Sequence, residues 1–479
     1  MRKTKIVCTL GPAVDDCKVL TKLFSAGMDV ARFNFSHGDY EQQLKRVEIF
    51  KAIRDELAIP IPMMLDTKGP EIRIGTFESG QAILHDGASF ILSQEPCLGD
   101  FSKVFVNYPH LHEDVSVGTT ILINDGLIEL KVKEILGKDV KCEVIHGGKL
   151  TDRKSVNIPG LSLQLPLLTE KDKQDIIFGI KNGFDIIAAS FVRKPEDILA
   201  IREVLKENNA ENIKIIAKIE NQEGVDNFDK ILDVVDGVMV ARGDLGVEIP
   251  MDKVPLLQKE FVRKCNQKGK TVIIATQMLE SMVSSPRPTR AEVNDVANAI
   301  FDGASAIMLS GEVAAGNYPI ESTKMMARIA ETIESGIDYW DNFSNQHTDY
   351  LKGNRPNLII GNSLCTIAMQ TNAKAIFALS SGGNTLNAIA SFKPACPVYL
   401  ITPNEMTARQ ISLTCGVYPI LVKSSDDSTD MIHEGIEIAK SCGYITEGDK
   451  IIIGESDTFA KPTKLGVSKS KNIGGIYTV

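Results

Sequence analysis

Residue patterns typical of disulfides, zinc sites and histidine-based hydrolysis are missing from this chain. The nine cysteines form no C-x-x-C pair and mostly lie beside apolar residues, which predicts reduced, mostly buried thiols in the cytoplasm. Among the seven histidines only His110 and His112 lie close together, so we expect any metal to be held by oxygen. No histidine ends a predicted strand beside a suitable nucleophile, which excludes a Ser-His-Asp hydrolase.

Long apolar runs and an excess of positive charge are also absent. No run approaches the roughly 18 apolar residues of a membrane helix, and the basic N-terminal residues precede only a short apolar stretch broken by Gly11-Pro12. We therefore expect neither a membrane span nor a secretory signal. The net charge of −9 makes nucleic acid or an anionic membrane a poor partner, but leaves room for a local basic pocket for a phosphorylated metabolite.

What is present is an ordinary globular composition, 43% hydrophobic and 24% charged, in 479 residues, which suggests about three domains. Short apolar runs alternate with helix-length segments over the first 340 residues, which indicates parallel strands. Eight such strand–helix units are the number that closes a (β/α)₈ (TIM) barrel. The predicted strands are 3–9, 29–36, 62–68, 185–191, 214–220, 237–243, 271–277 and 305–310.

The α/β pattern is interrupted once and then resumes. More than a hundred residues separate the third and fourth strands, and they contain alternating segments with turn signals such as Asn124-Asp125-Gly126. We predict that residues 1–69 and 166–340 form the barrel, and that 70–165 form an inserted small all-β domain, a β-barrel lid. A polar stretch over 341–357 is interpreted as a linker. Residues 341–479 are predicted to form a C-terminal open α/β domain, with strands near 374–380, 397–402, 417–422, 450–454 and 474–479.

Polar residues end several of the predicted barrel strands, where barrel enzymes carry their active groups. Side chains two apart share a face of a strand, so the period-two rule groups Arg32, Asn34 and Ser36 on one strand and Lys218 with Glu220 on another. Burying unpaired charge is costly, so these groups need mutual partners or ligands. Further candidates at the same mouth are Asp66, Arg73, Arg242, Asp244 and Thr276.

This set of side chains narrows the chemistry. Glu220 and Asp244 can offer two carboxylates to Mg²⁺, and the arginines and Lys218 offer cations for phosphate. Such a set suits phosphoryl transfer or enolate chemistry. Two alternatives stay open: a Mg²⁺-dependent aldolase or lyase that handles pyruvate enolate, and a catalytically inactive sensor whose C-terminal domain binds a metabolite. The aldolase or lyase would have no need of Arg32, Asn34 and Arg73 together.

Six segments resemble the pyruvate kinase family, in the family's order and across the whole barrel. They are Arg32–Gly38 (RFNFSHG), Leu65–Arg73 (LDTKGPEIR), Ile216–Asn221 (IAKIEN), Val240–Gly246 (VARGDLG), Ala275–Met282 (ATQMLESM) and Pro286–Glu292 (PRPTRAE). The resemblance implies transfer of the phosphoryl group of phosphoenolpyruvate to ADP, giving ATP and pyruvate in the last step of glycolysis. It also implies a barrel, a β lid, and a C-terminal regulatory domain.

The resemblance also implies roles for particular residues. Lys218 would stabilise the transferring phosphoryl group and then the enolate, and Thr276 would lie near the carbon that gains the proton. Glu220 and Asp244 would bind Mg²⁺ (or Mn²⁺), and the turn Ala241-Arg242-Gly243-Asp244 would hold the substrate carboxylate. Arg32 and Arg73 would be catalytic and would contact phosphates at the nucleotide side, where Asn34 and His37 would also bind the nucleotide, and Arg32 would in addition bind the substrate. Asn34, Ser36, Asp66 and Thr67 would coordinate K⁺.

Three further expectations follow from the same resemblance. Family members that carry lysine at the position of Glu71 are thought to use its ammonium in place of K⁺, so the acidic residue here predicts a K⁺ requirement. The loop Ser380–Thr385 offers backbone amides between a strand and a helix for a phosphorylated effector, or is an ordinary turn with a helix cap. A cytoplasmic homotetramer is the family expectation.

Overall fold

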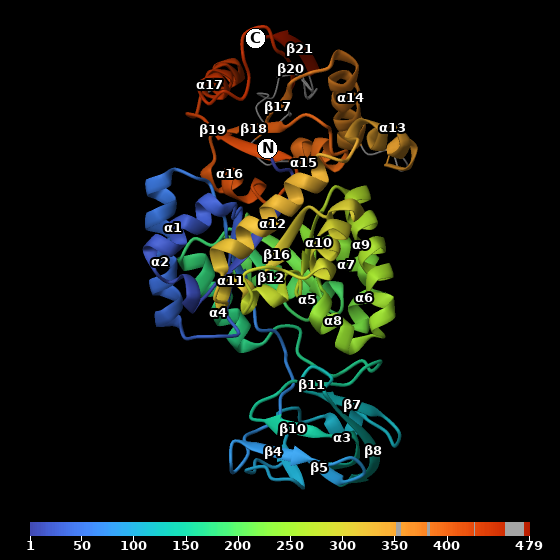
Figure 1. Ribbon diagram of the computed structural model, residues 1–479. Coiled ribbons are helices and arrows are strands. Elements are labelled where there is room, and N and C mark those ends of the chain that lie inside the picture. Colours follow the sequence, from blue (N-terminus) through green and yellow to red (C-terminus); the bar gives the residue numbers. More distant parts are fainter. Residues whose placement is uncertain (351–355, 381–383, 426, 456–473) are drawn as a thin grey trace.

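The computed structural model describes residues 1–350, 356–380, 384–425, 427–455 and 474–479. Three lobes follow one another along a single axis (Figure 1). The lobe of small strands and the C-terminal lobe lie at opposite ends of a central barrel. Among the described residues no helix combines the length and apolar character needed to cross a membrane.

The central lobe is the predicted closed barrel of eight parallel strands, in the order β1-β16-β15-β14-β13-β12-β3-β2. All eight predicted strands are confirmed, and seven end one or two residues before the predicted limit. The strands are β1 (Lys5–Leu10), β2 (Val30–Asn34), β3 (Met63–Asp66), β12 (Ile186–Ala189), β13 (Lys214–Ile219), β14 (Gly237–Ala241), β15 (Thr271–Ala275) and β16 (Ala306–Leu309).

Two apolar layers hold the barrel together. Side chains such as Val7, Met64 and Met239 fill its interior, while alternate residues such as Phe33 pack outward against the helices. This division is the period-two alternation of a strand. The main barrel helices are α1 (Cys17–Ala26), α2 (Tyr40–Leu57), α4 (Glu170–Lys181), α5 (Pro195–Glu207), α7 (Phe228–Val234), α9 (Val254–Lys268), α10 (Arg290–Asp302) and α12 (Pro319–Glu334). Shorter ones are η1 (Pro12–Val14), α6 (Gln222–Asp226), α8 (Arg242–Glu248), η2 (Met251–Lys253), η3 (Glu280–Val283) and α11 (Gly311–Ala314).

The lobe of small strands between β3 and β12, called the lid below, has its own apolar core, which runs from Ile72 to Ile158. Its strands pair as a six-stranded sheet, β11-β7-β8-β9-β5-β6, and a separate two-stranded ladder, β10-β4, so the predicted single β-barrel is wrong for this lobe. Isolated bridges such as Arg73 to Ser155 lie outside these strands. The elements are β4 (Gln81–Leu84), β5 (Ser89–Ser93), β6 (Lys103–Phe105), α3 (Leu111–Asp114), β7 (Thr120–Ile123), β8 (Ile128–Leu136), β9 (Asp139–His146), β10 (Gly148–Thr151) and β11 (Val156–Asn157).

Hydrogen bonds tie the lid to the barrel mouth. Arg193, which follows β12, donates to the carbonyl oxygens of Leu163, Leu165 and Pro166 where the chain returns from the lid. Asn157 of the lid donates to Glu248 of the barrel at 2.7 Å. These contacts keep the lid over the ends of the barrel strands.

The C-terminal lobe confirms all five predicted strands, in the order β19-β18-β17-β20-β21, with only β21 antiparallel. The effector loop proposed at Ser380–Thr385 includes residues 381–383, which lie outside the described residues. The elements are α14 (Pro356–Thr371), β17 (Ala375–Leu379), α15 (Asn384–Ser391), β18 (Val398–Thr402), α16 (Glu405–Ile411), β19 (Val417–Leu421), α17 (Ser428–Ser441), β20 (Lys450–Glu455) and β21 (Gly474–Thr478).

The predicted linker over 341–357 is wrong for much of its length. Helix α13 (Tyr339–Tyr350) occupies most of it, and α14 already begins at Pro356. Trp340 and Phe343, three residues apart, turn the same helix face toward the C-terminal core, and the Phe343 ring meets the Phe392 ring edge-on. The polar residues that suggested a linker include those of the outer helix face.

Candidate active site

The barrel strands bring the predicted polar residues to one mouth, which faces the lid. Asn34 at the end of β2 lies beside Asp66 at the end of β3, and Asp66 pairs in register with Ala188 of β12. Lys218 lies on the next strand, β13. Because parallel strands end at the same edge, residues remote in sequence meet here.

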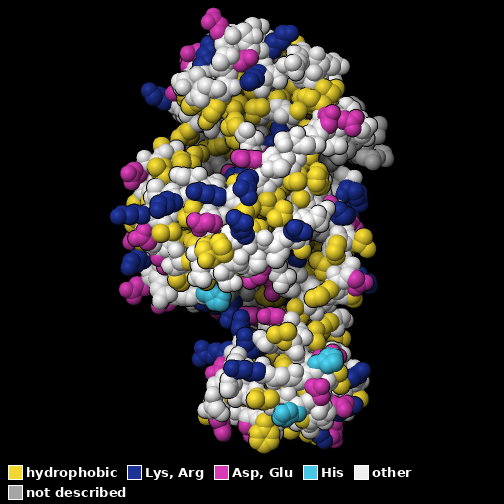
Figure 2. Space-filling view, viewed as in Figure 1, with side chains coloured by type: hydrophobic (Ala, Val, Ile, Leu, Met, Phe, Trp, Pro, Cys, Tyr) yellow, Lys and Arg dark blue, Asp and Glu magenta, His cyan; other side chains and the backbone are white. Residues whose placement is uncertain are grey.

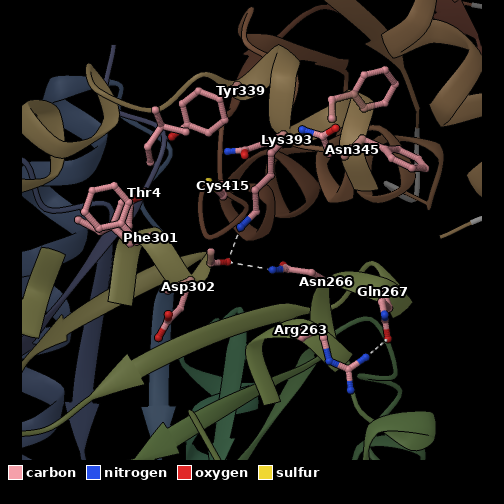
Figure 3. A pocket seen from close by; sticks show the side chains of 17 residues that line it. Thr4, Arg263, Asn266, Gln267, Phe301, Asp302, Tyr339, Asn345, Lys393 and Cys415 are labelled. Carbon is pink, nitrogen blue, oxygen red and sulfur yellow. Dashed lines mark hydrogen bonds between the residues drawn. The ribbon is translucent and has the colours of Figure 1, made fainter. Parts of the chain in front are cut away.

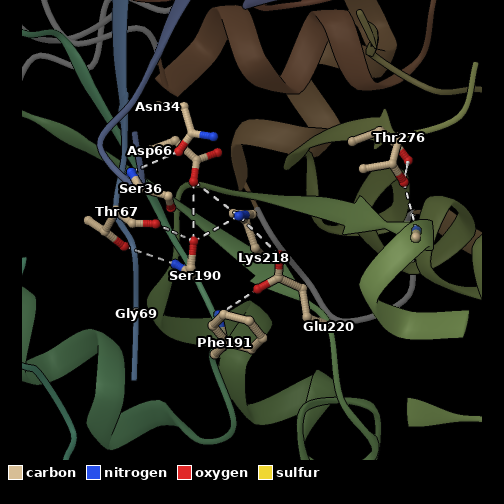
Figure 4. A network of polar contacts seen from close by, with 12 residues as sticks. Asn34, Ser36, Asp66, Thr67, Gly69, Ser190, Phe191, Lys218, Glu220 and Thr276 are labelled. Atoms are coloured by element: carbon tan, nitrogen blue, oxygen red, sulfur yellow. Dashed lines mark hydrogen bonds and ion pairs between the residues drawn. The ribbon is translucent and has the colours of Figure 1, made fainter. Parts of the chain in front are cut away.

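Lys218 is the centre of a buried network (Figure 4). Its Nζ lies 3.0 Å from Asp66 Oδ1, 3.0 Å from Glu220 Oε1 and 2.7 Å from Ser190 Oγ. The side chains of Asp66 and Glu220 are each 1% exposed, so both charges are almost entirely removed from water. Burial alone would lower the pKa of Lys218, but the carboxylates of Asp66 and Glu220 outweigh it and raise that pKa, which keeps the ammonium charged.

Arg32 joins this network from β2. Its Nε donates to Asp66 Oδ2 at 2.7 Å, and its Nη1 donates to the hydroxyl of Thr9 at 2.8 Å. Burial pushes the pKa of Asp66 up, but Arg32 and Lys218 together hold it below its ordinary value. These two contacts use two of the five N–H donors of the guanidinium, so Arg32 retains donors for a phosphate.

Glu220 and Asp244 form the acidic part of the site. Burial raises the pKa of Glu220 against the opposing effect of Lys218, and the nearby charge of Asp244 raises it further. Asp244 is exposed at the wall of the cleft, yet the surrounding protein removes enough water to raise its pKa; Lys218 opposes that shift, and Asp125 adds to it. Two carboxylates that share one ammonium suit a hard divalent cation, so these residues fit Mg²⁺ or Mn²⁺. Within the described part of the chain, no three Asp, Glu, His or Cys side chains converge as a metal site, so substrate oxygens and water would complete the coordination.

The oxygens expected to bind K⁺ lie at the ends of β2 and β3. Asn34 Oδ1 accepts the amide of Ser36 at 3.0 Å, and the carbonyl of Thr67 accepts the hydroxyl of Ser190 at 2.5 Å. The single carboxylate among them, Asp66, already faces Arg32 and Lys218. Neutral oxygens around a carboxylate whose charge is already balanced fit a monovalent cation better than a divalent one.

Thr276 lies at the end of β15 in an unusual backbone conformation. Its backbone φ angle is 70° and that of Gln277 is 54°. Residues other than glycine rarely adopt such values, and those that do are concentrated at functional sites. The hydroxyl of Thr276 accepts the amide of Gly243 at 2.7 Å and donates to the carbonyl of Ala275 at 2.6 Å. The turn 241–244 and the end of β15 are therefore fixed against each other.

Arg242 is committed to the protein rather than open to phosphate. Its two Nη atoms each lie 2.7 Å from a carboxylate oxygen of Asp295 on α10, and Nη2 also donates to the carbonyl of Thr276 at 2.9 Å. The suggestion that its side chain offers a cation to phosphate thus gains no support. The guanidinium instead anchors the loop that carries Thr276.

A cleft of about 1610 Å³ opens beside the network and carries His37, Asp125, Asp244 and Thr276 on its walls. A cavity of about 290 Å³ between the lid and the barrel adds Glu71 and Arg73, which pair at 2.6 Å. Arg73 thus lies on the lid side of Asp244, and no contact joins it to Arg32. Positively and negatively charged side chains lie close together where the lid meets the barrel (Figure 2).

A further pocket, of about 300 Å³, lies between the barrel and the C-terminal lobe. Its lining includes Arg263, Tyr339, Lys393 and Cys415, and Lys393 donates to the carbonyl of Gly303 (Figure 3). None of the site residues predicted from the sequence lines it.

Four residues of the site were not predicted from the sequence. Thr9 is the second-last residue of β1 and Ser190 directly follows β12, so the rule that found Thr276 at the end of an apolar strand also applies to them. The amide of Phe191, which donates to Glu220 at 2.6 Å, leaves no trace in the side-chain pattern. Asp295 lies within α10, where nothing in the sequence distinguishes it from a surface carboxylate.

The fold and the site together define a (β/α)₈-barrel enzyme equipped with carboxylates, a buried lysine and arginines for phosphoryl transfer. Comparison with known proteins identifies the family. The family model for the pyruvate kinase barrel domain matches residues 1–323, and that for the pyruvate kinase alpha/beta domain matches 359–469.

Individual relatives agree with these matches. A pyruvate kinase of Clostridium acetobutylicum is 47% identical over 454 residues, which cover 95% of this chain and 96% of the relative. One of Staphylococcus aureus is 48% identical over 95% of this chain and 77% of its own length. The crystal structure of a pyruvate kinase from Cryptosporidium parvum superposes with a TM-score of 0.93 at 37% identity, covering 100% of this chain and 96% of the other.

The chain belongs to the pyruvate kinase family. It is a phosphotransferase that transfers the phosphoryl group of phosphoenolpyruvate to ADP, giving ATP and pyruvate in the last step of glycolysis. The resemblance seen in the sequence is thereby confirmed. An aldolase or lyase and an inactive sensor are both disfavoured, because the match covers nearly the whole chain and the lysine–carboxylate network is intact.

Proposed function

We propose that Lys218 stabilises the charge that develops during phosphoryl transfer. Its ammonium is buried, held at fixed distances from Asp66, Glu220 and Ser190, and kept charged by those carboxylates. A fixed cation in a site that excludes water stabilises the spread negative charge of a transferring phosphoryl group without reorganisation. The same ammonium then stabilises enolpyruvate, which is also an anion.

The other residues divide the remaining tasks. Arg32 contacts the substrate phosphate from the barrel wall, and Arg73, with Asn34 and His37, lies at the nucleotide side. The turn Ala241–Asp244 meets the substrate carboxylate, and Thr276 orders the protonation of enolpyruvate, directly or through water. The lid excludes the water that would otherwise accept the phosphoryl group.

Glu220 and Asp244 would hold Mg²⁺ (or Mn²⁺), and Asn34, Ser36, Asp66 and Thr67 would hold K⁺. When bound, the divalent ion supplies positive charge to the oxygens of the phosphoryl group and the enolate. The proposal is supported by the surrounding protein, which removes water and so raises the pKa of both acidic side chains, while Lys218 opposes the shift of each.

Metal binding tests this assignment directly. Loss of a partner outside the coordination shell typically lowers metal affinity about 10- to 100-fold, so loss of a ligand should cost at least as much. We expect Asp244→Asn to weaken Mn²⁺ binding by that factor, measured on the full chain by electron paramagnetic resonance. Glu248→Gln removes a charge from the same helix, α8, and should bind Mn²⁺ as the unmodified protein does. Equal binding by Asp244→Asn and Glu248→Gln would contradict the assignment.

A homotetramer and a phosphorylated effector belong to the same proposal. Met251, Leu256 and Phe301 are 75%, 69% and 60% exposed, and a contact between subunits would bury apolar side chains of this kind. Sedimentation of the full chain is expected to give a tetramer, and a monomer would contradict it.

Sugar phosphates or nucleoside monophosphates are expected to lower the KM for phosphoenolpyruvate, and Gly383→Glu is expected to abolish that response.

A further inference from the structure

Ser190 directly follows β12 and lies between Asp66 and Lys218 in the lysine network (Figure 4). The residue is 8% exposed. Its Oγ lies 2.5 Å from the carbonyl oxygen of Thr67, 2.7 Å from Lys218 Nζ and 3.2 Å from Asp66 Oδ1. The hydroxyl has one hydrogen, which it donates in a hydrogen bond to the nearer oxygen, the carbonyl of Thr67. Its lone pairs therefore accept a hydrogen bond from Lys218.

The position of this hydroxyl is fixed from both sides. The Ser190 amide donates to Thr67 Oγ1 at 3.1 Å, so Ser190 donates to Thr67 twice, once from its amide and once from its hydroxyl. Gly69 packs directly on this corner: a Cβ there would lie 2.8 Å from the Phe191 ring and 3.0 Å from the Ser190 Cβ, and its φ of 73° also favours glycine. Ser190 therefore has no freedom to follow Lys218 if the lysine moves.

The next residue completes the arrangement. Phe191 has a φ of 55°, and its amide donates to Glu220 Oε2 at 2.6 Å. One strand end thus contacts both members of the Lys218–Glu220 pair, the hydroxyl of Ser190 holding the ammonium and the amide of Phe191 holding the carboxylate. A non-glycine residue held at positive φ persists only where its surroundings enforce it.

Ser190 differs from the other acceptors of Lys218 in one respect. Asp66 and Glu220 both carry charge and are both proposed to bind metal ions, whereas the Ser190 hydroxyl is neutral and has no such role. We infer that Ser190 is a positioning residue for the phosphoryl transfer, which holds the Lys218 ammonium at the place where it meets the phosphoryl group. The inference rests on the proposed role of Lys218.

Without this hydroxyl, the ammonium is left to the two carboxylates and moves toward them. Displacing a catalytic group by about 1 Å can cost on the order of 100-fold in rate, so Ser190→Ala is expected to lower kcat by roughly 10- to 100-fold. The KM for phosphoenolpyruvate should change much less than kcat, because Arg32 and the turn 241–244 still bind the substrate. Ser190→Thr keeps the hydroxyl and is expected to recover most of the lost kcat.

Two variants serve as controls. Ser305, which directly precedes β16 at the other end of the barrel, is similarly buried, and its hydroxyl accepts the amide of Val272. Ser305→Ala should lose comparable stability and leave kcat unchanged. In a Lys218→Met background, the further change Ser190→Ala should have little effect on kcat, because the group it positions is already gone.

The outcomes separate this inference from the proposed function. If Lys218→Met is inactive while Ser190→Ala keeps the unmodified kcat, the positioning role of Ser190 is overturned and the role of Lys218 stands. If Lys218→Met is itself active, the role of Lys218 is overturned and the inference falls with it. The positioning role is also overturned if Ser190→Ala lowers the melting temperature without lowering kcat. It is overturned as well if Ser190→Thr does not restore the kcat that Ser190→Ala loses.

Discussion

At the scale of single residues, the site holds charged side chains together where water cannot screen their attraction. Lys218, Arg32 and Asp66 form one buried chain of ion pairs in which each charge is balanced by neighbours on other strands. Breaking such a set by removing one member leaves a buried charge without compensation, which is more costly than the set is stabilising. The network combines residues at the ends of β2, β3, β12 and β13 because these neighbouring parallel strands end at the same mouth of the barrel.

Glu71 provides a test at this scale. Its carboxylate pairs with the guanidinium of Arg73 at 2.6 Å, and its charge helps to raise the pKa of Asp244, so it lies within reach of the acidic part of the site. With no lysine ammonium at this position, we expect low turnover in buffers free of Na⁺ and K⁺, with ionic strength held by tetramethylammonium. K⁺ should restore turnover, and Glu71→Lys should restore it in part without K⁺.

A second variant separates the effect of losing the Glu71 carboxylate from the effect of gaining an ammonium. Glu71→Gln removes the carboxylate without supplying an ammonium, so it should still depend on K⁺. Full activity of the unmodified protein in tetramethylammonium buffer would show that no monovalent cation is needed. In that case, the assignment of Asn34, Ser36, Asp66 and Thr67 would fall.

At the scale of elements, helix α10 shows how a secondary-structure signal supports the site. Thr289 caps the helix: its hydroxyl accepts the amide of Glu292, and the Glu292 carboxylate accepts the amide of Thr289 at 2.7 Å. Glu292 also accepts the amide of Ser281 in η3, so the cap joins two segments. The helix then presents Asp295 to Arg242, which in turn anchors Thr276.

Removal of this cap is expected to destabilise the barrel. An N-cap threonine replaced by alanine typically costs about 1 kcal/mol, because an amide of the first turn loses its acceptor. Thr289→Ala should lower the free energy of unfolding by that amount in a urea titration at pH 7, and Thr289→Ser should lower it much less. Equal stability of the alanine variant and the unmodified protein would show that the cap contributes nothing.

The elements also show where prediction from the sequence succeeds and where it stops. Buried parallel strands are continuous apolar runs, so β13 and β14 are readily recognised, and the polar residues that end them follow from the period of two. Asp295 could not be predicted because its partner Arg242 lies 53 residues away and only the closed barrel brings them together. Helix α13 could not be told from a linker in the sequence, because the two aromatic residues of its inner face, Trp340 and Phe343, are a weak signal among polar residues.

At the scale of the whole molecule, the C-terminal lobe is docked on the end of the barrel remote from the lid. Arg409 of α16 donates to the Asp185 carboxylate at 2.9 Å, and Gln410 donates to the carbonyl oxygens of Asp185 and Asn212. Asp185 is fully buried just before β12, the strand that Ser190 follows at its other end. The same strand thus meets the C-terminal lobe at one end and the active site at the other.

This contact has a predicted pH dependence. Burial raises the pKa of Asp185, and Arg409 opposes that rise. When the pKa of a carboxyl group is higher in the folded protein than its unfolded value of about 3.9, the group stabilises the fold at pH below the unfolded pKa. This stabilisation is lost as the pH rises through the folded pKa. Removing Arg409 raises the folded pKa further, so the cost of Arg409→Ala should grow with pH.

At neutral pH we expect Arg409→Ala to cost about 3–5 kcal/mol, the usual cost of leaving a buried charge without its partner. Thermal unfolding of the variant and the unmodified protein, compared at pH 5 and pH 8, measures the difference. A second substitution, Asp185→Asn, should remove the pH dependence of the cost. A cost that is the same at both pH values, or larger at pH 5, would contradict the role assigned to this pair.

The central claim is that the Lys218 network carries out phosphoryl transfer from phosphoenolpyruvate to ADP. The most direct test measures pyruvate and ATP formed from these substrates with Mg²⁺ and K⁺, for the unmodified protein and for Lys218→Met. We predict equal amounts of the two products from the unmodified protein, and a loss of about 10³-fold or more in the variant, because it lacks the cation that meets the transferring group. Circular dichroism and the melting temperature should confirm that the variant is folded. A folded Lys218→Met protein that keeps even a third of the turnover would contradict the account.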